Sequence, residues 1–229
     1  MQSYFLGALL HLSDPTLPIG GYTHSNGLET YVQEGIVNNA VTAKAFVVNM
    51  LQQNILYNDA AFMVSAYRAA AQQDLPELQR LSGECTALKS PMEIRQASIK
   101  LGLRLIKIFK RQQPFELVTQ FERAIREKEA DPHYCIVFGC YARLLDIPLP
   151  EALFAFYYNA AVGMITNSVK LVPLGQLDGQ DILFQIQPLL KELSETTVDI
   201  PDEMLGLCAV AFDIRCMRHE RLYSRLYMS

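Results

Sequence analysis

The chain has 229 residues, of which 50% are hydrophobic and 19% are charged. This composition allows a large buried core and excludes extended disorder. The formal net charge of −4 argues against a nucleic-acid-binding protein, because such proteins carry a basic excess. Five cysteines without a CxxC pair argue against a disulfide framework.

The N-terminal segment does not have the pattern of a signal peptide. A basic n-region is missing, and Asp14 and Pro15 interrupt the first apolar run. The longest apolar stretch, 153–166, is shorter than the roughly 20 residues that a transmembrane helix needs. We therefore expect a protein of the reducing cytoplasm without a membrane segment.

Apolar residues recur at helical spacing through the first half of the chain. The helices expected here are 3–12, 28–33, one capped by Asn38 or Asn39, one that begins at Asn58 or Asp59, and one capped by Asp74. Next comes the clearest local signal, Ser90-Pro91-Met92-Glu93. It predicts a capping box with Ser90 at the N-cap and Glu93 at the third helical position.

The second half of the chain continues the helical pattern. The helices expected here are one opened by Pro114, one opened by Asp131 and Pro132, the longest at 151–171, one through 182–189 and a last one that starts near Asp199. No segment shows sustained strand-like alternation. We therefore predict an all-α fold, with residues 1–229 forming a single domain of about eight to ten helices.

Two irregular segments interrupt the helices. The loop 13–27 contains two prolines and three glycines. It is either a structural loop or a recognition loop that presents Tyr22, His24 and Ser25. The corner 167–180 follows the longest helix and contains the helix breakers Pro173, Gly175 and Gly179.

The corner also carries Lys170 and three amide side chains, Asn167, Gln176 and Gln180. Amides both donate and accept hydrogen bonds. They therefore either satisfy open helix ends or form a partner-binding site.

The last residues combine arginine with tyrosine and leucine. From Asp213 to the end the formal charge is +2, and the rest of the chain carries −6. Arginine and tyrosine are enriched at interface hot spots. A basic tail on an acidic body suggests an acidic docking partner. We expect a partly flexible tail from about residue 219 that binds such a partner, with a solvated or frayed terminal helix as the alternative.

The sequence contains none of the common catalytic motifs considered for a helical or nucleotide-binding protein. There is no GxxxxGK[ST] loop, no GxGxxG after a strand, no HExxH and no paired Glu-x-x-His. Two local pairs, His133 with Cys135 and Cys216 with His219, are weak metal-ligand candidates because a site needs three or four ligands. We predict no catalytic residue, no cofactor and no resident metal.

Four stretches, in order along the chain, resemble the urease accessory protein family UreF. They are Ser-Asp-Pro-Thr-Leu-Pro-Ile-Gly-Gly-Tyr-Thr-His-Ser-Asn-Gly-Leu-Glu at 13–29, Lys-Ser-Pro-Met-Glu-Ile-Arg at 89–95 with Leu-Gly-Leu-Arg-Leu at 101–105, Val-Lys-Leu-Val-Pro-Leu-Gly-Gln at 169–176 with Gly179 and Gln180, and His-Glu-Arg-Leu-Tyr-Ser-Arg-Leu at 219–226. The chain departs from the family in lacking a tryptophan before the third stretch. It also ends in Tyr-Met-Ser rather than Phe-Arg-Ser.

The resemblance implies an all-helical protein without catalysis of its own. Members of this family act with UreD (also called UreH) and the GTPase UreG on apo-urease, and the assembly delivers nickel to urease in a GTP-dependent way. They commonly form homodimers that bridge UreD to UreG. Taking loop, corner and tail together, the expected partner-binding residues are Tyr22, His24, Lys170, Pro173, Gly175, Gln176, Gln180, His219, Glu220, Tyr223, Ser224 and Arg225.

Two other functions are compatible with the sequence. The first is a regulator of GTP hydrolysis by UreG, in which Lys170 or Arg225 reaches the nucleotide as an arginine finger does. The second is a metal-binding helical enzyme that uses Cys216 and His219. We expect neither nucleic acid nor a membrane as a partner.

Overall fold

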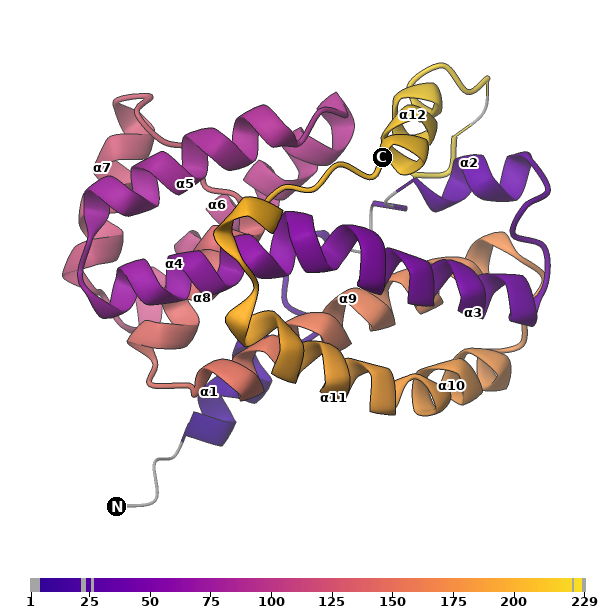
Figure 1. Cartoon of the computed structure of the whole chain (residues 1–229), viewed down its shortest axis with the longest axis horizontal. Coiled ribbons are helices and arrows are strands. Elements are labelled where there is room, and N and C mark those ends of the chain that lie inside the picture. Colours follow the sequence, from indigo (N-terminus) through magenta and orange to yellow (C-terminus); the bar gives the residue numbers. More distant parts are fainter. Residues whose placement is uncertain (1–4, 22–23, 26, 224, 228–229) are drawn as a thin grey trace.

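A computed structural model of the chain describes residues 5–21, 24–25, 27–223 and 225–227. Throughout these ranges the regular secondary structure is helical, which confirms the all-α prediction (Figure 1). The helices in chain order are α1 (Phe5–Leu12), α2 (Leu28–Gln33), α3 (Ala40–Asn49), the π-helical η2 (Met50–Ala60), α4 (Ala61–Ala71), α5 (Leu75–Leu88), α6 (Met92–Gln112), α7 (Glu116–Arg126), α8 (Tyr134–Leu144), α9 (Leu149–Leu171), α10 (Gln176–Gln185), α11 (Gln187–Thr196), the 3-10 turns η3 (Thr197–Asp199) and η4 (Asp202–Met204), and α12 (Val210–His219).

The segments α3, η2 and α4 follow one another without a break and form one long helix. Counted this way, the described residues contain ten helices of seven or more residues, in line with the expected eight to ten. Among these helices none combines the length and the apolar character that a membrane span needs.

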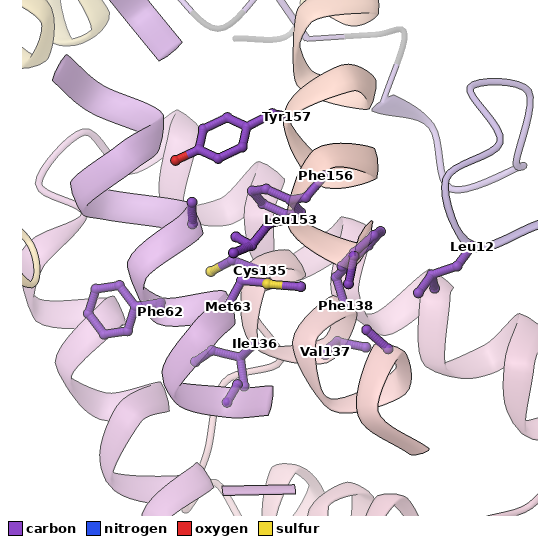
Figure 2. Packing of buried hydrophobic residues seen from close by; sticks show 14 of the residues in the cluster. Leu12, Phe62, Met63, Cys135, Ile136, Val137, Phe138, Leu153, Phe156 and Tyr157 are labelled. Atoms are coloured by element: carbon purple, nitrogen blue, oxygen red, sulfur yellow. The ribbon is translucent and has the colours of Figure 1, made fainter. Parts of the chain in front are cut away.

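The centre of the core lies where α4 packs against α8, and α9 covers the contact (Figure 2). Side chains such as Met63, Phe138 and Tyr157 are almost completely buried there. The central position of α8 agrees with its sequence, because residues 134–141 are apolar on nearly every face. The two helices approach closely at Gly139, where an added Cβ would lie 2.2 Å from the Met63 carbonyl oxygen.

Local capping signals fix two helix starts as predicted. The Asn39 side chain accepts a hydrogen bond from the Thr42 amide, and the Thr42 hydroxyl reaches back to the Asn39 amide. At the start of α5, the Asp74 carboxylate accepts from the Glu77 amide at 3.0 Å. Each cap satisfies backbone donors that have no partner inside the helix.

The predicted helix start at Asn58 or Asp59 is wrong, because both residues lie inside the long helix and have tertiary partners. The side-chain amide of Asn58 donates to the Leu207 carbonyl at 3.0 Å, and the Asp59 carboxylate pairs with the buried Lys89 ammonium at 2.8 Å. The connection before α12 therefore crosses the π-helical stretch and is fixed to it.

The helix expected through 182–189 is divided at Ile186, where α10 ends and α11 begins. Two helix starts also differ from the prediction. Helix α6 begins at Met92 with Pro91 at its N-cap and without a side-chain cap, so the capping box of Ser90 is absent. The last helix begins at Val210 rather than near Asp199, where the chain forms only 3-10 turns. At the start of α6, the Glu93 carboxylate has a partner far away in sequence, the His219 ring.

The close contact at Gly139 leads to a stability prediction. Gly139→Ala places a methyl group against backbone that cannot move independently, so we expect a loss of about 1–3 kcal/mol in the free energy of unfolding. Urea denaturation followed by circular dichroism measures it.

Gly83→Ala is the matched control, because Gly83 is exposed in α5 and nothing lies within 4 Å of an added Cβ. We expect this change to stabilise the protein by about 0.5–1 kcal/mol through helix propensity. Equal effects at the two positions would contradict the close packing of α4 on α8.

Candidate partner-binding site

Helix α12 carries the C-terminal motif and lies against α2 and α6 (Figure 1). The contact with α2 is close at Gly27, which precedes that helix with φ of +79°. A Cβ at Gly27 would lie 2.6 Å from the Cys216 sulfur and 3.1 Å from the Phe212 ring. Glycine thus permits both the backbone conformation and the approach of α12.

At the end of α12, the His219 ring lies between two carboxylates. Its Nδ1 is 2.6 Å from Glu93 Oε2, and its Nε2 is 3.1 Å from Glu29 Oε2. The His219 side chain is 1% exposed, and Glu29 is buried as well. Both ring nitrogens of the buried His219 therefore have a carboxylate oxygen within hydrogen-bond distance.

The same two carboxylates bind the residues that follow. Arg225 donates to Glu93 Oε1 at 2.7 Å. The backbone amides of Leu226 and Tyr227 donate to the Glu29 carboxylate at 2.7 and 3.2 Å. We call Glu29, Glu93, His219, Arg225 and the two amides the tail cluster. It connects α2, α6 and the C-terminal residues by charge-assisted hydrogen bonds.

A second, more exposed set of ion pairs attaches α12 to the end of α2. The Glu34 carboxylate accepts from Arg215 at 2.9 Å and from Arg218 at 3.1 Å. Hydrogen bonds from Arg215 and then Arg218 lower the pKa of Glu34. Arg215 also lies over the Tyr31 ring, 4.7 Å from its centroid. Three carboxylates of the acidic body are thus the partners of the basic α12 and tail.

The predicted tail residues separate into two groups. His219 is buried in the tail cluster, and Arg225 is exposed but paired with Glu93. Glu220 is exposed, and Tyr223 is completely exposed. Leu226, beside Arg225, is 68% exposed. Ser224 lies outside the described residues, as does Tyr22 of the loop.

The corner after α9 lies at the surface. The predicted residues that are exposed there are Lys170, Pro173, Gly175, Gln176 and Gln180. The Gly175 amide donates to Asp178 at 2.8 Å, so Asp178 caps α10. In the described part of the chain, no hydrogen bond involves the Gln176 or Gln180 side chains. The interpretation that these amides satisfy open helix ends is therefore wrong for both glutamines.

The third corner amide, Asn167, is buried and binds the loop. Its side chain donates to the His24 carbonyl at 2.7 Å, so the corner 167–180 is in direct contact with the loop 13–27. His24 is 6% exposed and lies inside the protein in this conformation. Burial lowers the pKa of His24, and the nearby cations of Lys100 and Arg104 lower it further. The ring is therefore neutral at pH 7.

The two weak metal-ligand pairs have other surroundings. Both ring nitrogens of His133 are near hydroxyl groups, of Thr86 at 2.9 Å and Ser98 at 3.2 Å. Cys216 packs against Gly27, and His219 faces two carboxylates. Over the described residues, no group of three or more His, Cys, Asp or Glu is arranged to hold a metal ion.

Sequence reasoning missed Glu29, Glu34 and Glu93 as partners of the tail. Glu93 was interpreted as a local capping residue, and Glu29 was noted only as the end of the first motif. The available signal was the opposite charge of tail and body, which indicated an acidic partner without identifying it. Glu29 and Leu226 are 197 positions apart, and helical periodicity carries no information about such a pairing.

The tail cluster leads to a prediction about protease sensitivity. Glu93→Gln keeps the size of the side chain but removes the charge that His219 and Arg225 face. Loss of charge-assisted hydrogen bonds of about 1.5–3 kcal/mol each increases the population of released tail about tenfold or more. We expect trypsin to cleave after Arg221 and Arg225 correspondingly faster, as measured by intact-mass spectrometry.

Glu84→Gln serves as the control, because Glu84 pairs with Arg80 on the α5 surface, away from the tail cluster. Its cleavage rate should equal that of the unaltered protein. If Glu93→Gln is cleaved no faster than this control, Glu93 does not hold the tail.

Comparison with known proteins gives a consistent answer. The sequence model of the family described as UreF matches residues 37–187 of this chain. The "Urease accessory protein UreF" of Actinobacillus pleuropneumoniae serotype 5b (strain L20) is 50% identical over 224 residues, which cover 98% of this chain and 99% of the relative. That of Haemophilus influenzae (strain ATCC 51907 / DSM 11121 / KW20 / Rd) is 48% identical over 98% of this chain and 95% of the relative. That of Bacillus sp. (strain TB-90) is 32% identical over 97% of this chain and 98% of the relative. The chain therefore belongs to the UreF family of urease accessory proteins.

Proposed function

We propose that this protein is a non-catalytic scaffold of urease maturation in the cytoplasm. It acts as a homodimer with UreD (UreH), the GTPase UreG and apo-urease in the GTP-dependent insertion of nickel. Membership of the UreF family supports the accessory role. The observation that carries the proposal is the tail cluster, which gives the tail a defined conformation with Tyr223 and Leu226 facing outward.

An ordered tail suits binding better than a free one. Ordering a segment upon association costs free energy, which lowers affinity. Here His219, Arg225 and two backbone amides already hold the tail before any partner arrives. The completely exposed Tyr223 offers a large aromatic surface of the kind enriched at interface hot spots.

The corner supplies a second part of the proposed interface. Beside the exposed Gln176 and Gln180, two large apolar side chains of α10 face solvent: Leu177 is 79% exposed and Phe184 is 75% exposed. Apolar side chains next to free amides and a cation, Lys170, resemble the mixed composition of protein interfaces.

Size-exclusion chromatography with light scattering tests the scaffold role. The protein is run alone, then with UreD and UreG from the same genome. We expect a dimer alone and a ternary peak in the mixture. A chain that ignores both partners would overturn the proposal.

Tyr223→Ala separates binding from folding. Because Tyr223 is fully exposed, its truncation should change the free energy of unfolding by no more than about 0.5 kcal/mol. We expect the ternary peak to disappear while the helical circular dichroism stays the same. The control is Val41→Ala, which truncates a residue of α3 that is 78% exposed. Unchanged complex formation by Tyr223→Ala would remove the tail from the proposed interface.

The second candidate function is regulation of UreG, in which a cationic side chain of this protein reaches the nucleotide. Lys170 is exposed and suits this role better than Arg225. Arg225 is paired with Glu93, whereas Lys170 has no ion pair in the described part of the chain. An arginine finger accelerates GTP hydrolysis by about 10³–10⁵ in GTPases that use one. If Lys170 acts this way, Lys170→Ala abolishes the acceleration but preserves the ternary peak. If the rate of GTP hydrolysis by UreG does not change when the unaltered protein is added, this candidate is excluded.

A further inference from the structure

Helix α6 carries a row of four cations on one exposed face. They are Lys100, Arg104, Lys107 and Arg111, spaced four, three and four residues apart. At 100° per residue these positions fall within about 60° of one another around the helix axis. All four are exposed. We call them the basic stripe.

Neighbouring basic residues are neutralised, but the basic stripe is not. Lys110 pairs with Glu122, Arg123 with Glu127, and Arg80 with two glutamates. Throughout the described ranges, none of the four stripe cations forms an ion pair with a carboxylate. This is unexpected in a chain of net charge −4, where acidic residues are in excess.

The C-terminal half of the stripe borders a hollow in the surface. The hollow has a volume of about 580 Å³ and is lined by Pro18, Arg104, Lys107, Ile108, Arg111 and Gln112. Arg104 donates to the Ile19 carbonyl at 2.7 Å, which fixes the wall formed by the loop 13–27. Three cations, an amide and two apolar side chains thus face one concave surface.

The spacing of the stripe suits an extended acidic peptide. With a rise of 1.5 Å per residue, successive cations are about 6, 4.5 and 6 Å apart along the helix axis. Alternate side chains of an extended strand are about 6.6 Å apart on one face. The long lysine and arginine side chains can accommodate the difference. Four carboxylates at alternate positions of a seven-residue segment therefore match the four cations.

We propose that the basic stripe of α6 binds an extended, carboxylate-rich segment of a partner protein. A nucleic acid is disfavoured because the chain, with a net charge of −4, lacks the basic excess that nucleic-acid-binding proteins carry. The stripe shares no residue with the tail cluster or the corner, and the proposal does not rest on the proposed function. Its test therefore uses the isolated chain.

The probe is a fluorescein-labelled peptide with glutamate and serine alternating over seven residues. Its isomer, with the four glutamates contiguous, has the same charge and composition. We expect fluorescence anisotropy at low salt to give tighter binding of the alternating peptide. Lys107→Gln with Arg111→Gln should weaken that binding about tenfold or more, because two charge pairs are lost.

Arg126→Gln with Lys128→Gln is the matched control. It removes the same charge from exposed positions at the end of α7 and in the turn that follows. We expect less than about a twofold change, since only diffuse attraction is altered. Circular dichroism checks that each variant is folded.

Three results would overturn the proposal: no binding of the alternating peptide, equal weakening by the two double variants, or equal affinity for the two peptides. A single-stranded DNA of equal charge that binds the stripe more tightly than the peptide would also overturn it and would assign the stripe to nucleic acid.

Discussion

The position of the C-terminal segment depends on one buried polar cluster, in which His219 is enclosed by Glu29 and Glu93. Each of these side chains would be costly to bury alone, because a polar or charged group without a partner in the interior loses its hydration. Together they satisfy both ring nitrogens and, through the remaining carboxylate oxygens, Arg225 and the amide of Leu226. The cluster exists only when α2, α6 and α12 are all in place.

The apolar core and this polar cluster have different functions in the fold. The contact of α4 with α8 is held by dispersion and burial, and close packing at Gly139 makes it specific. The tail is held by directed hydrogen bonds to charged groups. Changes at Glu93 should therefore affect the tail before they affect the core, so the tail can be examined in a protein that remains folded.

The sequence predicted the helices well where local chemistry determines them. Asn39 and Asp74 are caps because their side chains bond to amides three residues later, a relation visible in any sequence. The same local reasoning failed at Asn58, Asp59 and the expected capping box of Ser90 and Glu93. In these places partners distant in sequence take a side chain: Asn58 binds Leu207, Asp59 binds Lys89, and Glu93 binds His219 and Arg225. Polar residues thus mark a helix start only when no tertiary partner competes.

The candidate site was predictable as a set of segments but not as an assembled surface. The charge difference between tail and body indicated that the tail needs an acidic partner, and the structure identifies that partner within the chain itself. In the proposed function, this self-neutralisation has a consequence for recognition. With His219 and Arg225 held by glutamates, the large apolar side chains of the tail left for a partner are Tyr223 and Leu226, beside the exposed Glu220 and Arg221. A protein that binds the tail in this conformation therefore finds an aromatic and aliphatic surface there, whereas one that recognises Arg225 must first displace Glu93.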